Sequence, residues 1–168
     1  MGPTIMHGYP TAGFEAAVRS HERELISFAF RLLAREDAAR DCVQDAFLKA
    51  HEALCRGAAP EKIRPWLYRL VYHAAVDRRR RQAVEEHGRR RVAASAPTAP
   101  ETRIEGLEGL LETLSSPHRE ILVLRYVYDF SYAEMESILG LPAPTLRVYA
   151  ARGLEQLQKN LQEDRHGV

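Results

Sequence analysis

Apolar residues recur at three- and four-residue steps along most of the chain, a spacing that places them on one face of an α-helix. Three such runs fill the first half, at 14–33, 37–54 and 65–82. Asp37 is a suitable N-cap for the second run, and Pro65 suits the first turn of the third. The pattern therefore predicts three long helices, and no strand pattern competes with them.

The apolar pattern stops at 92–104, where small residues and prolines are typical of a linker. It then resumes and continues to about residue 163. We therefore predict an all-α fold of two small helical domains, at 13–91 and 105–163, joined by a flexible linker.

The second domain has the layout of a helix-turn-helix. Runs at 107–114 and 118–130 each predict one helix. Ser131 and Glu134 then form the S-x-x-E pattern of a capping box, and Gly140 is a natural stop for the short helix that they begin. A second helix follows after very few residues, as the motif requires.

The last predicted helix runs from about Thr145 to Gln162, and its two faces differ. Arg and Gln residues lie on one face, which could enter a DNA major groove with its first turns against base edges. A plain helical hairpin with a solvated charged face has the same pattern, so both interpretations stay open at this point. The other face should meet the core through Leu146, Ala150, Leu157 and Leu161.

Charge is distributed unevenly although the net charge is only +1. Residues 62–91 hold 10 Lys and Arg against three Asp and Glu, and the flanking parts are acidic. So dense a positive block favours a polyanion or a membrane surface as partner. Neither a signal peptide nor a run long enough to span a membrane is visible, so we expect a cytoplasmic protein without membrane insertion.

Motifs of enzyme chemistry are missing from the sequence. The seven His form no H-x-x-x-H pair, and neither a nucleophile motif nor a phosphate-binding glycine loop occurs. We expect no catalytic residue, no metal site and no cofactor. Cys42 and Cys55 have no partner at metal spacing and are expected to be buried or half-buried thiols.

The stretch 64-RPWLYRLVYHAAVDRRRRQ-82 combines aromatic residues with four consecutive arginines. Arginines can hold phosphates, and aromatic or apolar side chains can support a base that has left the stack. Trp66 and Leu70, four residues apart, are expected in the core rather than against a ligand.

Three stretches together resemble the extracytoplasmic-function (ECF) group of the sigma-70 family of RNA polymerase sigma factors. They are 37-DAARDCVQDAFLKAH-51, 64-RPWLYRLVYHAAVDRRRR-81 and 114-LSSPHREILVLRYVYDFSYAEMESILGLPAPTLRV-148. They occur in the family's order, with a linker between the second and the third. The resemblance implies two helical domains, called regions 2 and 4.

The resemblance also implies three binding surfaces. The first binds core RNA polymerase at the β′ clamp helices and would use Asp41, Gln44, Asp45, Phe47 and Lys49. The second recognises and melts the promoter −10 element and would use Arg56, Arg64, Arg69, His73, Asp77, Arg78, Arg79, Arg80 and Arg81. The third reads the −35 element and would use Thr145, Arg147, Val148, Tyr149 and Arg152. Further partners implied are the polymerase β flap and an anti-sigma factor.

This sequence departs from the family pattern at several of these positions. His73 stands where the family usually has Asn, at the position associated with the flipped −10 base. In the last helix Val148 and Tyr149 replace a polar residue and a cation. These changes leave the promoter sequence open.

Two alternatives compete with a promoter-recognition subunit. A helix-turn-helix regulator would explain the last sixty residues but not 37–81, and it would need a receiver or ligand domain. A degenerate sigma-like protein, acting through protein partners alone, would explain the changes at His73, Val148 and Tyr149.

Overall fold

The computed structural model describes residues 11–89, 111 and 113–166, and every regular element among them is a helix. The chain divides into two compact units, Met1–Ala99 and Pro100–Val168. The prediction of an all-α fold with two helical domains is confirmed. The predicted linker at 92–104 lies outside the described residues, so the domain limits at 91 and 105 stay a prediction.

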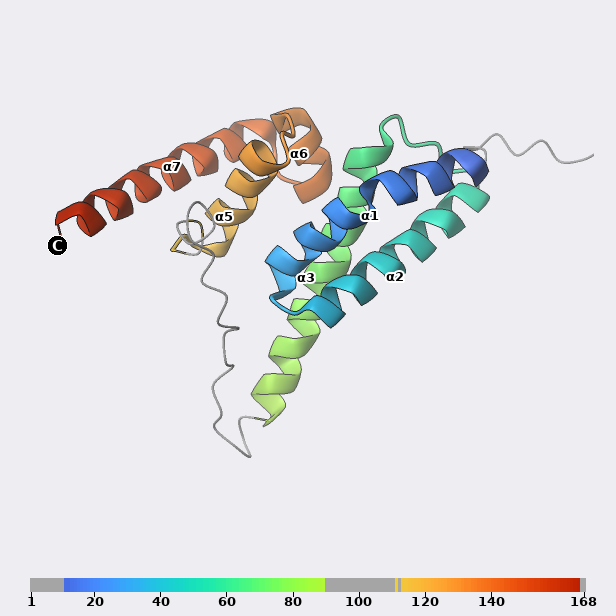
Figure 1. Cartoon of the computed structure of the whole chain (residues 1–168), viewed down its shortest axis with the longest axis horizontal. Helices are drawn as coiled ribbons and strands as arrows, with labels where there is room; N and C mark the ends of the chain where they lie inside the picture. The colour runs from blue at the N-terminus through green and yellow to red at the C-terminus, as the bar shows by residue number, and fades with distance from the viewer. Residues whose placement is uncertain (1–10, 90–110, 112, 167–168) are drawn as a thin grey trace, which may run out of the picture. The chain divides into compact units, whose positions relative to one another are not determined.

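The first unit is a bundle of three helices, α1 (Thr11–Leu33), α2 (Glu36–Cys55) and α3 (Ile63–Arg89), each of which contacts the other two (Figure 1). Long helices form here because their apolar stripes cover one another. Phe28 and Tyr68 lie at the centre with ring centroids 4.9 Å apart. The remaining core includes Leu25, Ala39, Val43, Ala46, Leu67, Val71 and Ala75.

The start of α2 differs from the prediction. The N-cap is Arg35, which makes no capping hydrogen bond through its side chain, and Asp37 lies inside the first turn. Ala34 turns the chain with a φ of 54°, in the left-handed region. Glu36 and Asp37 then place negative charge at the positive end of the helix dipole, which favours an early start.

The third helix also begins earlier than predicted, at Ile63, with Pro65 in its first turn. The core placement of Trp66 and Leu70 is wrong, because both are only half-buried. The bundle is instead sealed by Leu67, Tyr68 and Val71, which project from the adjacent face of α3.

The second unit contains α5 (Ser116–Leu122), η1 (Val123–Val127), α6 (Tyr132–Leu139) and α7 (Ala143–His166). The helix-turn-helix formed by α6 and α7 is as predicted. The Ser131 side chain accepts a hydrogen bond from the Glu134 backbone, the Glu134 carboxylate accepts one from the Ser131 backbone, and Gly140 ends α6 with a φ of 70°. Leu111 and Leu114 are buried, and most of the rest of the helix predicted at 107–114 lies outside the described residues.

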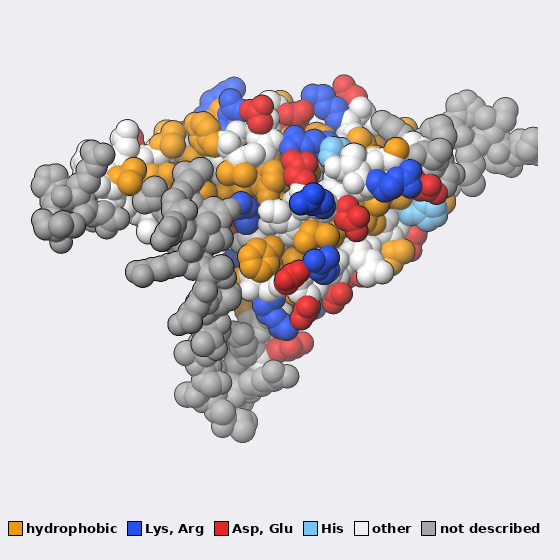
Figure 2. Space-filling model, in the orientation of Figure 1, with side chains coloured by type: hydrophobic (Ala, Val, Ile, Leu, Met, Phe, Trp, Pro, Cys, Tyr) orange, Lys and Arg blue, Asp and Glu red, His pale blue; other side chains and the backbone are white. Residues whose placement is uncertain are grey.

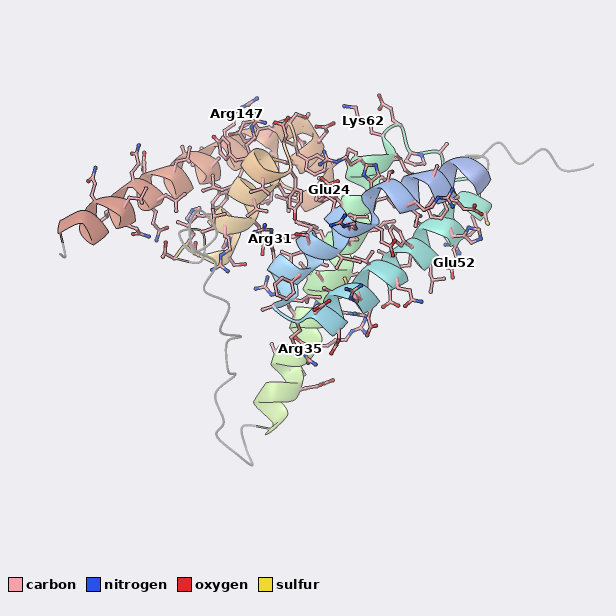
Figure 3. All side chains as sticks on the ribbon, in the orientation of Figure 1. Glu24, Arg31, Arg35, Glu52, Lys62 and Arg147 are labelled. Atoms are coloured by element: carbon pink, nitrogen blue, oxygen red, sulfur yellow. The ribbon has the colours of Figure 1, made fainter. Side chains whose placement is uncertain are left out.

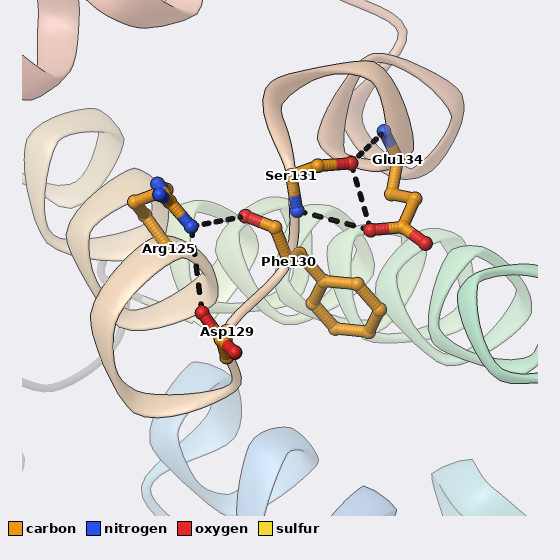
Figure 4. Close-up of polar contacts among 5 residues, drawn as sticks. All are labelled: Arg125, Asp129, Phe130, Ser131 and Glu134. Carbon is orange, nitrogen blue, oxygen red and sulfur yellow. Dashed lines mark hydrogen bonds and ion pairs between the residues drawn. The ribbon is translucent and has the colours of Figure 1, made fainter.

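The single helix predicted at 118–130 is wrong, because η1 interrupts it as a π-helix. The Tyr128 N–H bonds the Val123 carbonyl five residues back, at 3.1 Å. Arg125 reinforces the distortion by donating to the Phe130 carbonyl at 3.2 Å and pairing with Asp129 at 3.5 Å (Figure 4). The wider turn leaves the Tyr126 side chain 57% exposed while Phe130 is buried.

The second helix of the helix-turn-helix, α7, packs on α5 and α6. Leu146, Ala150 and Leu157 are buried as predicted, whereas the core placement of Leu161 is wrong, since it is 42% exposed. Gly153 allows the close approach: a Cβ added there would lie 3.0 Å from Leu122 Cδ1. None of the described helices is long and apolar enough to cross a membrane.

Candidate nucleic-acid interface

The outward face of α2 carries most of the side chains predicted to bind polymerase. Asp41, Gln44, Asp45 and Lys49 are exposed, while Phe47 is half-buried. Leu48 is 58% exposed among them, which makes it an apolar side chain at the centre of a polar face. Sequence reasoning missed Leu48, although its position one residue off the apolar stripe was the available signal.

Arg78 is turned inward and joins α3 to α2. Its Nη2 donates to Asp45 Oδ2 at 2.6 Å, and its Nη1 donates to the Ala38 carbonyl at 2.8 Å. The Arg78 side chain is 24% exposed. Arg78, predicted to hold a DNA phosphate, is therefore paired within the bundle. Its partner Asp45, predicted to bind polymerase, is paired there as well.

Arg64 is the second inward cation. It is ion-paired and hydrogen-bonded to Glu24 of α1, and its guanidinium lies 5.4 Å from the centre of the Tyr68 ring (Figure 3 labels Glu24). Burial raises the pKa of Glu24, but hydrogen bonds from Arg64, Tyr68 and His21 and the charge of Arg64 together outweigh it, so the pKa lies below its usual value. Burial likewise opposes the charge on Arg64, yet Glu24 raises its pKa. The pair ties the start of α3 to α1.

The other residues predicted for the −10 element lie on the surface. The exposed side chains are Arg56, Arg69, His73, Asp77, Arg79, Arg80 and Arg81. Arg56 reaches Glu52 only at 3.9 Å, a weak contact between exposed groups. Because successive helical residues are about 100° apart, four consecutive arginines cannot share one face. Arg78 takes the inner face, and the next three point outward.

His73 lies in the middle of this exposed face. It is one turn from Arg69, and its ring centroid is 5.9 Å from that of Tyr72. Trp66, half-buried, lies two turns before it. Ring systems and cations follow one another from Trp66 to His73 along the solvent side of α3, and Asp77 then separates His73 from Arg80. Stacking and charge on this face can hold a nucleic-acid strand.

A groove of about 280 Å³ lies between the start of α2 and the stretch of α3 around Arg78 and Arg81. It brings Asp41, predicted for polymerase, together with Arg81, predicted for DNA. The lining contains both arginines and carboxylates, so the groove is neither uniformly positive nor uniformly negative. On the face shown in Figure 2 acidic and basic side chains likewise interleave. The groove is lined by Arg35 (labelled in Figure 3), Asp37, Ala38, Asp41, Arg78, Arg81 and Gln82.

The residues predicted to read the −35 element occupy the first turns of α7. Arg147, Val148 and Arg152 are exposed, and Thr145 is half-buried. The Arg147 guanidinium lies 5.2 Å from the centre of the Tyr132 ring, a cation–π contact across the helix-turn-helix. Tyr149 is half-buried against His118 of α5, with ring centroids 5.5 Å apart, so much of this side chain is used in packing.

The two thiols differ in exposure. Cys42 is buried, as predicted, and its thiol contacts the Val71 carbonyl at 3.6 Å. Burial raises the pKa of Cys42 to about 11, so the thiol stays protonated at neutral pH. Cys55 is exposed, contrary to prediction. Within the described ranges no group of His, Cys, Asp and Glu could hold a metal ion.

Comparison with known proteins agrees with this architecture. The model of Sigma-70 region 2 matches residues 17–85, which span the three-helix bundle, and that of Sigma-70 region 4 matches residues 104–157, which include the helix-turn-helix. The chain therefore belongs to the sigma-70 family of RNA polymerase sigma factors, as a factor of the ECF type.

Individual relatives cover nearly the whole chain. The RNA polymerase sigma factor YlaC of Bacillus subtilis is 27% identical, over 90% of this chain and 93% of YlaC. The ECF RNA polymerase sigma factor SigW of the same organism is 26% identical, over 89% of each chain. The sigma factor RpoE of Bartonella quintana, solved with the anti-sigma factor NepR, has the same fold, with a TM-score of 0.73, 23% identity and coverage of 89% of this chain and 96% of RpoE.

Proposed function

We propose that this sigma factor binds core RNA polymerase and directs initiation at specific promoters, melting the −10 element through region 2 and reading the −35 element through region 4. The observation that carries the proposal is the pairing of regions 2 and 4 in one chain, each with a helix that presents cations to solvent. A helix-turn-helix regulator would not need the bundle of α1 to α3.

The α2 face supports polymerase binding. Asp41 and Gln44 suit a basic protein partner, although Asp45 on the same face is already paired with Arg78. The exposed Leu48 offers an apolar anchor at the centre of the face. The β′ clamp helices are the proposed partner of this face. The β flap is the proposed partner of region 4.

The outer face of α3 supports recognition of the −10 element. Arg69 and Arg80 would hold phosphates on either side of His73, whose ring would stack on or hydrogen-bond an extruded base. Arg64 and Arg78 would contribute indirectly, because they hold α3 against α1 and α2. This division assigns DNA contact to the exposed cations alone.

The first turns of α7 support recognition of the −35 element. Arg147 can read guanine or hold phosphate, and the exposed Val148 can contact a thymine methyl group. Arg152, about a turn and a half further on, suits the DNA backbone. Tyr149 would act mainly through packing on α5.

Control by an anti-sigma factor is part of the proposal. RpoE, which shares the fold, was solved with the anti-sigma factor NepR. An inhibitor of this kind would act by covering the surfaces that polymerase and DNA need.

Runoff transcription tests the proposal. Purified protein is added to bacterial core polymerase and a library of genomic fragments, and transcripts are sequenced from their 5′ ends. We expect initiation at a small set of promoters that share −10 and −35 elements, and none without the protein. Failure on every fragment, with stable binding to core polymerase, would favour the degenerate sigma-like alternative.

A further inference from the structure

A carboxylate from the preceding helix accepts a hydrogen bond from the N-terminus of α7. The first four backbone N–H groups of a helix have no partner within it. The first bond of α7 runs from the Leu146 N–H to the Pro142 carbonyl, so the positions without a partner are Pro142, just before the helix, and Ala143, Pro144 and Thr145. The two prolines have no N–H. The Ala143 N–H donates to Glu136 Oε2 at 3.0 Å. Only Thr145 keeps an N–H to offer to an outside acceptor.

A helix N-terminus normally attracts phosphate, because its N–H groups and the helix dipole both favour an anion. Glu136 lies in the last turn of α6 and is exposed, so its charge stands beside the end of α7 that is proposed to meet DNA. A phosphate approaching this end meets a negative charge and an N–H that is already bonded.

We propose that Glu136 weakens the hold of region 4 on the DNA backbone and thereby sets the affinity and selectivity of −35 recognition. This inference rests on the proposed function of α7. Backbone contacts position a protein on DNA but carry no sequence information, whereas side chains on base edges do. If contact with the DNA backbone is weakened, a larger share of the binding free energy comes from the side chains of Arg147, Val148 and Arg152.

The experiment uses the full chain bound to core polymerase and a fluorescent duplex that carries a promoter found by runoff transcription. Glu136→Gln removes the charge but keeps an oxygen that can accept the Ala143 N–H bond. Glu136→Ala removes both. Glu155→Gln is the matched control, since Glu155 is an exposed carboxylate of α7 that lies about 18 Å along the helix from Ala143, beyond the screening length of physiological salt.

We expect Glu136→Gln to lower the Kd about two- to fivefold at low salt, with a smaller gain at high salt, and to reduce discrimination against mutated −35 elements. Glu136→Ala should also bind more tightly despite a lower melting temperature. Glu155→Gln should bind like the wild type.

Binding by Glu136→Gln that is no tighter than that of Glu155→Gln would overturn the inference and leave the proposed function standing. Binding by Glu136→Ala that is weaker than that of the wild type would also overturn the inference, since that result would mean that Glu136 only supports the fold. Absence of promoter binding by the wild-type complex would overturn both.

Discussion

The two helices proposed to meet DNA, α3 and α7, use their arginines differently. Two arginines of α3 point inward, where Arg64 pairs with Glu24 and Arg78 with Asp45. In α7 the inner face is apolar and includes Gly153, while Arg147 and Arg152 both lie on the surface. Both helices pack through an apolar face, and α3 has ion pairs from two inward arginines in addition.

This difference teaches that a cluster of arginines in the sequence is not yet a DNA-binding surface. Arginine is long enough to reach a neighbouring helix, and its guanidinium can satisfy a carboxylate and a carbonyl at once, as Arg78 does. The inner arginines add ion pairs to the apolar contacts of α3, while the outer ones stay on the surface. Substitutions can separate the two roles.

The largest effect is expected from crowding the tight contact of α7. Gly153→Val should lower the free energy of unfolding of the second unit by about 2 kcal/mol, because the Leu122 and His118 side chains would have to move. Ala151→Val, at an exposed position of the same helix, is the control. Hydrogen exchange followed by mass spectrometry separates the units, and equal protection of α5 in both variants would contradict the packing account.

The next effect is expected from removing an inner cation of α3. Arg78→Met should lower the free energy of unfolding of the first unit by about 1–2 kcal/mol, since it loses bonds to Asp45 and Ala38 that are partly screened by solvent. Arg80→Met should change it by less than about 0.5 kcal/mol. Urea unfolding measures both, and similar midpoints would show that Arg78 is not a brace.

A functional effect of comparable size is expected at His73 on the outer face of α3. His73→Ala should reduce open-complex formation about tenfold, as stacking on one base contributes about 1–3 kcal/mol, and should leave closed-complex binding nearly unchanged. His73→Asn, which restores the residue usual in the family, should recover part of the loss. Permanganate reactivity and gel shifts distinguish the two steps, and an equal loss in both would argue against a role in melting.

The smallest effect concerns the pH dependence of the Arg64 contact. The pKa of Glu24 is lowered in the folded state, so its ionisation stabilises the fold above the unfolded value of 4.5, and this stabilisation disappears as the pH falls through the folded value. The two side chains are each 31% exposed, so solvent screens the pair and the stabilisation amounts to less than about 1 kcal/mol. Glu24→Gln should therefore be less stable than the wild type at pH 7 and nearly equal to it below pH 3, in denaturant titrations. A difference that persisted at low pH would point to packing instead.

Local signals in the sequence predicted part of this architecture well. The capping box at Ser131 and the stop at Gly140 depend on neighbouring residues alone, and both are confirmed. The π-helix at 123–127 could not be predicted, because VLRYV has the same apolar pattern as an α-helix and the distortion depends on Arg125 reaching the Phe130 carbonyl.

The apolar periodicity of the helices predicted which candidate-site residues are exposed, but not which ones pair with distant residues. The exposed positions of Arg147 and Arg152 follow from the apolar stripe of α7. The inward positions of Arg64 and Arg78 do not, because they depend on carboxylates that lie 40 and 33 residues away in the sequence. Glu136 was missed for a related reason, since its bond to Ala143 spans the turn between two helices.

Arg78 is expected to brace the bundle, while Arg80 is expected to contact DNA. The most direct test of this division is the salt dependence of promoter binding by polymerase bound to the Arg78→Met or the Arg80→Met variant of this chain. If Arg80 holds a phosphate and Arg78 does not, Arg80→Met should reduce the slope of log K against log salt by about 1, while Arg78→Met should leave it unchanged. A reduced slope for Arg78→Met with an unchanged slope for Arg80→Met would contradict the account.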